Sequence, residues 1–296
     1  MKIMLLGMGE IGNALQHILR QRSDLQVIGW DKNASKYPDQ PNLETSVADA
    51  DVIFICVPSW NVRGALLSIA RFVKPSAAIF SLTKGIEKES CKTMDQLLYE
   101  IFPGHPFGIL GGPMLAEDIL SNKTTAAVLG SSSAEARKLG KRLFKNTSLQ
   151  LSVTSDARGV ALCGVLKNAF TLGLGIAEGS GMGENARGAL FAHALTEMRI
   201  IVQALGGKSK TVLGLAGAGD FFATVQSRHS RNKMVGITLG TGADGHLESE
   251  GFISLFCLVK LTEALGIRLS LLENLAKIAN EQAAPSLLEE VIFDTR

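Results

Sequence analysis

The feature that most constrains the fold is a change of pattern near the middle of the chain. Short, continuous apolar runs alternate with helix-like segments up to about residue 157, and only helix-like segments follow. Such runs are typical of buried parallel strands whose sheet is covered by helices on both faces. The sequence therefore predicts an α/β domain with a doubly wound sheet over residues 1–157, followed by an all-α domain over residues 158–296.

The expected elements follow from the same pattern. The strands are expected at 2–7, 25–30, 51–58, 77–82, 107–113, 124–130 and 149–156. The helices of the second half are expected at 158–178, 185–205, 220–228, 230–239, 251–265 and 270–281. Apolar residues at helical spacing also predict helices at 10–22 and 62–73 in the first half.

Composition excludes several classes of protein. The 296 residues are 46% hydrophobic and 20% charged, which is typical of a globular protein, and the net charge of +2 gives no reason to expect nucleic acid as a partner. The four cysteines form no C-x-x-C pair and no cluster with zinc-ligand spacing, so we expect no metal. Unpaired cysteines in apolar runs favour a reducing compartment, and we expect a cytoplasmic protein.

The most apolar stretch, residues 159–177, is long enough to be tested as a membrane span. Lys167 and Asn168 lie near its middle, and a central lysine is costly in lipid, so we expect no span. Burying an ammonium is also unfavourable unless the group is paired or used. Lys167 is therefore either a functional residue or a lysine that snorkels out of a core helix.

A glycine motif follows the first expected strand. The sequence GMGEIG places Gly7, Gly9 and Gly12 in a G-x-G-x-x-G pattern between a strand and a helix. Gly7 permits a tight turn, Gly9 lets a pyrophosphate approach the backbone, and Gly12 allows the helix to pack closely on the strand. The pattern predicts a dinucleotide site in a Rossmann-type domain, where the helix N-terminus faces the phosphates.

An acidic residue ends the second expected strand. Asp31 stands where a carboxylate can accept hydrogen bonds from the adenosine ribose hydroxyls. A carboxylate would repel a 2′-phosphate, so we expect NAD as the cofactor, with NADP as the alternative because Lys32 is adjacent. The other interpretation of Asp31 is an exposed loop aspartate.

Several further segments carry a resemblance to a known family. They are SLTKGIE (81–87), GGPMLAED (111–118), CGVLKN (163–168), GLAGAGDFFATVQSRHSRN (214–232), VPS (57–59) and EG (250–251). In this order, from residue 1 to about 290, they resemble NAD(P)-dependent glycerol-3-phosphate dehydrogenase. The resemblance implies reversible reduction of dihydroxyacetone phosphate to sn-glycerol 3-phosphate by hydride transfer, in support of glycerophospholipid synthesis.

The resemblance also implies roles for individual residues. Lys167 is the expected acid/base, since a desolvated lysine has a pKa lowered toward neutrality. The other catalytic residues that it implies are Asn168, Lys84 and Asp220, although Asp220 also reads as a helix N-cap. The implied substrate-binding residues are Lys84, Gly112, Met114, Lys167, Asp220, Thr224, Ser230, Arg231 and Asn232. The implied cofactor-binding residues are Gly7, Gly9, Glu10, Ile11, Gly12, Asp31, Pro58, Lys84, Ala116, Arg231 and Glu250.

The chain departs from the family pattern at a few of these positions. Met114 stands where the family usually has a small polar residue, and Glu10 and Ile11 stand where it usually has a small polar residue and an aromatic one. Met114 offers no strong hydrogen bond, so another small phosphorylated or carboxylated ketone is an alternative substrate. A non-catalytic, redox-sensing protein that binds NAD is a further alternative. The expected partner is a small molecule, and a homodimer is compatible with the sequence.

Overall fold

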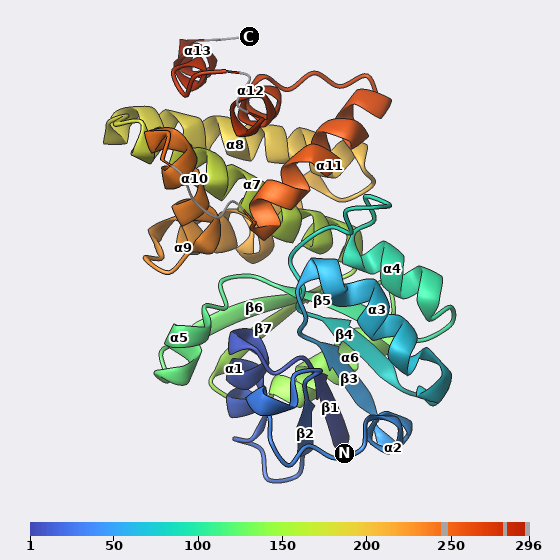
Figure 1. Ribbon diagram of the computed structural model, residues 1–296. Helices are drawn as coiled ribbons and strands as arrows, with labels where there is room; N and C mark the ends of the chain where they lie inside the picture. Colours follow the sequence, from blue (N-terminus) through green and yellow to red (C-terminus); the bar gives the residue numbers. More distant parts are fainter. Residues whose placement is uncertain (244–247, 281–282, 294–296) are drawn as a thin grey trace.

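The computed structural model describes residues 1–243, 248–280 and 283–293, which form a sheet-containing part and a helical part (Figure 1). The carboxyl ends of the central strands face the helical part, because the loops that follow these strands contact its helices. Ligands of open α/β sheets bind at this edge. The predicted fold class, a Rossmann-type domain followed by an all-α domain, is confirmed. The domain limits at 157 and 158 stay a prediction.

The sheet has seven strands in the order β2-β1-β3-β4-β5-β6-β7. They are β1 (Lys2–Leu6), β2 (Gln26–Trp30), β3 (Val52–Ile55), β4 (Ala78–Ser81), β5 (Phe107–Gly111), β6 (Thr125–Gly130) and β7 (Leu149–Thr154). All expected strands are present, each slightly shorter than predicted. Five of the six pairings are parallel, but β6 runs antiparallel to β5. The expectation of a parallel sheet was wrong for this pairing, because the intervening helix α5 (Ala116–Leu120) is too short to return the chain along the sheet.

Residues alternate along the strands between two apolar layers. Leu5 and Phe54 face the helices α1 (Glu10–Leu19) and α6 (Ala134–Phe144), whereas Leu6 and Ile55 face the opposite side. The helices of this part are α1 (Glu10–Leu19), α2 (Leu43–Asp49), α3 (Ser59–Ile69), α4 (Met94–Ile101), α5 (Ala116–Leu120) and α6 (Ala134–Phe144). The second layer continues into the helical part, so one core joins both parts.

The helical part is built around α7. Its helices are α7 (Ala157–Gly179), α8 (Glu184–Ala204), α9 (Asp220–Gln226), α10 (Arg231–Thr241), α11 (Glu250–Ala264), α12 (Ser270–Ala279) and α13 (Leu287–Phe293). A π-helical turn, Leu215–Gly219, leads into α9. All six predicted helices of the second half are present; the expected last residue of the sixth, 281, lies outside the described residues. Among the described helices, α7 alone is long and apolar enough to cross a membrane, and its apolar window is completely buried inside the protein, as in a core helix.

Glycines let α10 lie directly against α7. A Cβ on Gly236 or Gly240 of α10 would collide with a backbone oxygen of α7, and one on Gly175 or Gly179 of α7 would collide with a backbone oxygen of α10. Because the four glycines lack a Cβ, the two backbones touch, and the pair forms the most extensive helix contact in the protein. This contact places the N-terminus of α10 beside the middle of α7, where Lys167 lies.

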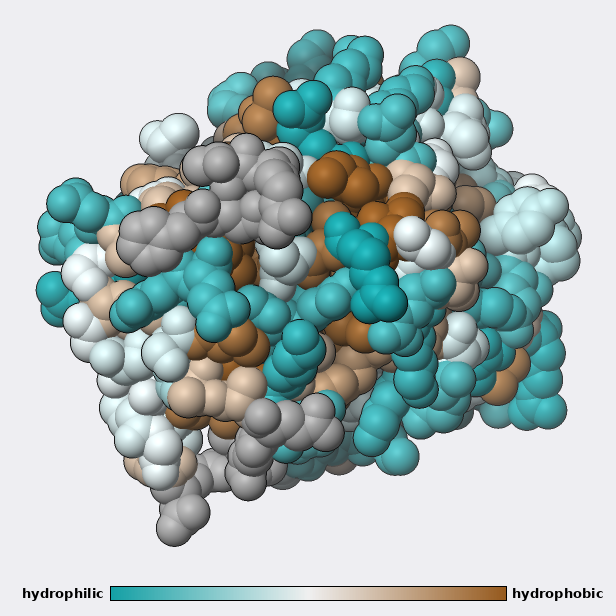
Figure 2. Space-filling model, turned by 90° about the horizontal axis from the view of Figure 1, so that it is seen from above, coloured by the Kyte–Doolittle hydropathy of each residue, from teal (hydrophilic) through white to brown (hydrophobic). Residues whose placement is uncertain are grey.

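The outer surface of the helical part is mixed in character. Seen from this end of the molecule, hydrophobic residues gather near the middle of the face, and hydrophilic residues surround them (Figure 2). Exposed large apolar side chains in this part include Ile200, Leu213, Phe222, Met234 and Leu265. Scattered exposure of this kind is normal for a protein surface and identifies no partner by itself.

Candidate active site

The glycine motif forms a tight turn between β1 and α1. Gly7 has φ +99°, a conformation that favours glycine, and its N–H donates to the carbonyl of Trp30 at 2.8 Å. A Cβ on Gly12 would collide with the carbonyl oxygen of Gly7, so only glycine lets the helix start here. Gly9 is the N-cap of α1 and has open space where a Cβ would stand. The turn therefore fits a pyrophosphate at the helix N-terminus.

Asp31 follows β2 and holds the same turn from the side. Its carboxylate accepts hydrogen bonds from the backbone N–H of Met8 at 2.8 Å and of Asn33 at 2.9 Å. The carboxylate is thus fixed beside the glycine turn, which fits recognition of a ribose. Glu10 begins α1 with an exposed side chain, and Ile11 is half-buried.

Lys167 lies in the buried middle of α7 and points toward α9. Its Nζ donates to Thr224 Oγ1 at 2.8 Å and lies 3.5 Å from Asp220 Oδ1. Desolvation lowers the pKa of Lys167 to about 8, against the opposing attraction of Asp220, and the positive charge of Lys84 lowers it further. Lys167 is therefore a paired, buried lysine whose pKa is lowered toward neutrality, and not one that snorkels to solvent.

Asp220 joins the two lysines. It is 1% exposed, and its Oδ2 lies 2.7 Å from Lys84 Nζ, which also donates to the carbonyl of Gly112 at 2.9 Å. Gly219, rather than Asp220, is the N-cap of α9, so the carboxylate of Asp220 pairs with the lysines instead of capping a helix. The fold thus brings the side chains of Lys84 and Lys167 to the two oxygens of one buried carboxylate.

A chain of amide hydrogen bonds connects four elements at this point. Asn168 Nδ2 donates to the carbonyl of Lys84 at 2.7 Å, and Asn232 Nδ2 donates to Asn168 Oδ1 at 2.9 Å. The N–H of Gly251 then donates to Asn232 Oδ1 at 2.8 Å. The side chains of Asn168 and Asn232 thus hold the β4–α4 loop, α7, α10 and α11 together. The second amide N–H of each has no hydrogen bond to another residue that the structure describes.

The N-terminus of α10 carries the rest of the SRN segment. Ser230 is the N-cap and accepts a hydrogen bond from the N–H of Lys233 at 3.4 Å. Arg231 is exposed, and no ion pair involves it among the residues that the structure describes. A free guanidinium beside a helix N-terminus is suited to bind a phosphate.

Glu250 begins α11 and ties it to α3. Its two carboxylate oxygens accept from the N–H of Ser59 at 2.8 Å and from Ser59 Oγ at 2.5 Å, and burial raises the pKa of the carboxyl. A Cβ on Gly85 would collide with the carboxylate. The sequence alone did not identify Ser59 and Gly85 as site residues. Each directly follows a residue that it did identify, Pro58 and Lys84 respectively.

Two expected residues lie apart from this polar cluster. Met114 is 5% exposed, and its side chain packs in the apolar layer around α1. Ala116 is the first residue of α5. Gly112 lies close through its carbonyl, with φ +104°. Contacts of these residues with substrate or cofactor stay a prediction.

The glycine turn, the fixed Asp31 and the buried lysine at the edge of the helical part define a Rossmann-type dehydrogenase with a helical second domain. Residues 36–137 match the family model for the N-terminus of NAD-dependent glycerol-3-phosphate dehydrogenase, and residues 156–290 match the model for its C-terminus. The chain belongs to the NAD-dependent glycerol-3-phosphate dehydrogenase family, as its sequence resemblance indicated.

Individual relatives agree with this assignment. The glycerol-3-phosphate dehydrogenase (NAD(P)+) of Acidithiobacillus ferrooxidans is 32% identical over 96% of this chain and 91% of its own length. That of Mycobacterium tuberculosis is 34% identical over 82% of this chain and 74% of its own length. The crystal structure of the Coxiella burnetii enzyme covers 98% of both chains at 27% identity, with a TM-score of 0.89. A ketopantoate reductase from Ralstonia eutropha, at 15% identity and a TM-score of 0.60, shares the fold alone.

Proposed function

We propose that the protein catalyses the reversible NAD(P)H-dependent reduction of dihydroxyacetone phosphate to sn-glycerol 3-phosphate. The observation that carries the proposal is Lys167, a buried lysine with a pKa near 8 that is hydrogen-bonded to Thr224 and paired with Asp220. Family membership supports the same reaction, since the relatives are named for it.

The cofactor site has the features that NADH requires. The glycine turn of Gly7, Gly9 and Gly12 would hold the pyrophosphate, and Asp31 would hold the adenosine ribose. Bound NADH would supply the hydride to the C2 carbon of the substrate. Further cofactor contacts are proposed for Glu10, Ile11, Pro58, Lys84, Ala116, Arg231 and Glu250.

Lys167 is proposed to act on the C2 oxygen. Its ammonium polarises the ketone, stabilises the charge that develops on the oxygen, and delivers the proton that completes the alcohol. Asp220 orients Lys167 and Lys84 through its two oxygens, which lie 3.5 and 2.7 Å from the ammonium nitrogens. In the reverse direction, neutral Lys167 accepts the proton from the hydroxyl group.

The phosphate of the substrate is assigned to the start of α10. Ser230, Arg231 and the free amide N–H of Asn232 surround a helix N-terminus, and Arg231 is exposed and able to move. Because the amide chain joins Asn232 to Asn168, next to Lys167, a phosphate here would lie within reach of the reacting end of the same small molecule. Gly112, Met114 and Thr224 complete the proposed substrate contacts.

The test is NADH oxidation by the purified protein with dihydroxyacetone phosphate, repeated with NADPH and with a panel of small ketones. We expect dihydroxyacetone phosphate to be the best substrate and kcat/KM to be higher with NADH, because Asp31 would repel a 2′-phosphate. A better rate with another ketone would support the alternative that Met114 suggested. Binding of NADH with no turnover on any ketone would support the non-catalytic alternative, against which the intact lysine–aspartate group argues.

The wider setting is also proposed. A supply of sn-glycerol 3-phosphate for phospholipid synthesis and a cytoplasmic location follow from the reaction and from four unpaired cysteines. A homodimer stays a prediction, which light scattering of the purified protein would check.

A further inference from the structure

Two cysteines far apart in the sequence meet at the junction of the two parts. Cys91 lies in the loop between β4 and α4, and Cys257 lies in α11. The Sγ of Cys257 lies 3.6 Å from the carbonyl oxygen of Lys88, and the Sγ of Cys91 lies 4.0 Å from the same oxygen. Both sulfur atoms therefore lie against one carbonyl oxygen, on neighbouring segments of the folded chain. Cys56 and Cys163 are each buried elsewhere.

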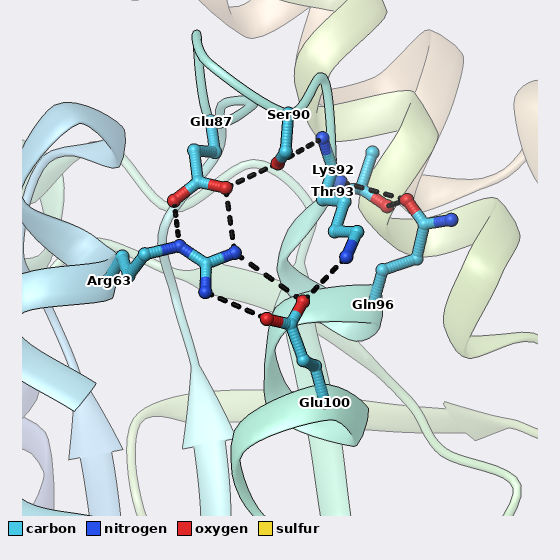
Figure 3. A network of polar contacts seen from close by, with 7 residues as sticks. All are labelled: Arg63, Glu87, Ser90, Lys92, Thr93, Gln96 and Glu100. Atoms are coloured by element: carbon cyan, nitrogen blue, oxygen red, sulfur yellow. Dashed lines mark hydrogen bonds and ion pairs between the residues drawn. The ribbon is translucent and has the colours of Figure 1, made fainter. Parts of the chain in front are cut away.

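The loop that presents Cys91 is held in place. Arg63 of α3 binds Glu87 and Glu100 together, and Glu100 also binds Lys92, so the loop is fixed on both sides of Cys91 (Figure 3). The N–H of Cys91 donates to the carbonyl of Glu87 at 2.8 Å. The backbone of Cys91 has φ +53°, a left-handed conformation that non-glycine residues rarely adopt. The fold therefore holds the loop that carries Cys91 beside the part of α11 that carries Cys257.

We propose that Cys91 and Cys257 form a reversible disulfide that ties the β4–α4 loop to α11. With a peroxide as oxidant, Cys91–SH reacts with H2O2 to give Cys91–SOH and water. The Cys257 sulfur then attacks the sulfenic sulfur, forming the S–S bond and releasing a second water. Overall, two thiols and one H2O2 give one disulfide and two waters, and a dithiol reductant reverses the reaction.

The surroundings assign the two steps to different cysteines. Cys91 is half-buried and accessible to a small oxidant, whereas Cys257 is 3% exposed. Burial raises the pKa of Cys257 to about 12, and contact with Cys91 and the charge of Glu89 raise it further against the effect of Lys260. Because Cys91 is the thiol that the oxidant can reach, Cys91 is oxidised first and Cys257 resolves it.

This bond would cross from one part of the molecule to the other. The loop begins after Lys84, and α11 begins with Glu250, so the two segments joined are those that also meet at the candidate active site. The proposal concerns the thiols alone and does not depend on the identity of the substrate.

The test is oxidation of the purified, folded protein with excess H2O2, followed by alkylation, proteolysis and mass spectrometry. We expect the peptides that contain Cys91 and Cys257 to be linked, with a mass two hydrogens below their sum. We also expect a thiol assay under denaturing conditions to fall from four thiols to two and to return to four after dithiothreitol.

Variants separate this outcome from general oxidation. Cys91→Ser and Cys257→Ser should each abolish the linked peptides, whereas Cys163→Ala should keep them. If circular dichroism shows that Cys257→Ser is unfolded, Cys257→Ala is used in its place. The proposal is overturned if Cys91 accumulates as sulfinic acid while Cys257 remains a thiol, or if both cysteines stay reduced under conditions that oxidise free cysteine.

Discussion

At the scale of single residues, Lys167 shows how one buried charge is made useful. Its ammonium is buried away from solvent, and Thr224 and Asp220 replace only part of the solvation that water would provide. The remaining cost lowers the pKa to about 8, so the group both carries a charge and releases a proton near neutral pH. A surface lysine would have no comparable shift.

Lys167→Met is expected to lower turnover by at least about 1,000-fold while NADH binding is retained, since the acid/base and its charge are both lost. Steady-state kinetics and fluorescence titration with NADH would measure the two effects. Lys141→Met, at an exposed position of α6, is the matched control and should keep full turnover. Turnover of Lys167→Met near that of the unmodified protein would contradict the assignment.

The pH dependence of the reaction provides a second check on Lys167. Ketone reduction requires the ammonium form, so kcat/KM for reduction should fall as the pH rises through about 8. Alcohol oxidation requires the neutral amine and should rise over the same range. Rate profiles in both directions between pH 7 and 10 would measure this; a reduction rate that stays level up to pH 10 would exclude Lys167 as the titrating acid.

At the scale of elements, helix contacts position the active-site groups. The glycines of α7 and α10 bring the two backbones together, and this contact sets the place of Ser230, Arg231 and Asn232 relative to Lys167.

The N-terminus of α12 is capped from another helix, because its own N-cap residue makes no side-chain hydrogen bond there. Glu197 of α8 instead accepts hydrogen bonds from the N–H groups of Leu271 and Leu272 at 2.7 and 2.9 Å.

Gly236→Ala tests the contact between α7 and α10. The new methyl group would collide with the carbonyl oxygen of Leu172, so we expect a loss of about 1–3 kcal/mol in the free energy of unfolding. The KM for dihydroxyacetone phosphate should also rise, because α10 must move. Gly188→Ala in α8 is the control: its Cβ would meet nothing within 4 Å, and it should gain up to about 1 kcal/mol. Equal stability of the two variants would contradict the prediction.

The buried carboxyl group of Glu197 is expected to make the stability of the protein fall as the pH rises. Burial raises its folded-state pKa to about 7 from an ordinary value of 4.5, so between these values the folded protein keeps a proton that the unfolded chain releases. The contribution of Glu197 to the free energy of unfolding therefore falls as the pH rises from about 4.5 to 7, by at most about 3 kcal/mol. Denaturation of the unmodified protein and Glu197→Gln at pH 5 and 8 would measure the change, with Glu184→Gln, exposed on the same helix, as control. A difference that is independent of pH would refute it.

At the scale of the whole molecule, the two parts are joined by a shared core and by a few polar ties. The apolar layer under α3 and α4 continues around α7 into the helical part. Glu250 binds Ser59, Asp220 binds Lys84, and Asn168 binds the β4–α4 loop. Each of these contacts joins the carboxyl edge of the sheet to a helix of the second part, so the site exists only when both parts are folded and packed.

Ser59→Ala tests the tie between α3 and α11. It removes the hydroxyl that donates to Glu250 and leaves a buried carboxylate with one donor, which should cost about 1–3 kcal/mol. We also expect scanning calorimetry to show less cooperative unfolding of the two parts. Ser68→Ala, at an exposed position of the same helix, should have little effect. Identical calorimetric profiles of the two variants would contradict the role of this contact.

Local pattern was sufficient to predict much of this molecule. Apolar runs, helical spacing and the glycine motif predicted the seven described strands, six helices of the second half and the turn around Gly7, because strands, helices and tight turns depend on neighbouring residues; α13 was not predicted. The antiparallel β6 was missed, since its direction depends on how far the short α5 carries the chain back along the sheet.

Contacts between distant segments were decided by the tertiary structure alone. The sequence singled out Lys167, but the packing of α7 against α9 gave it Asp220 and a pKa near 8. Met114 is predicted to line the substrate site, and only the tertiary structure shows that its side chain packs in the apolar layer around α1. The contact of Glu250 with Ser59 and the position of Cys91 and Cys257 beside the Lys88 carbonyl left no local pattern, because each joins segments that only the folded chain brings together.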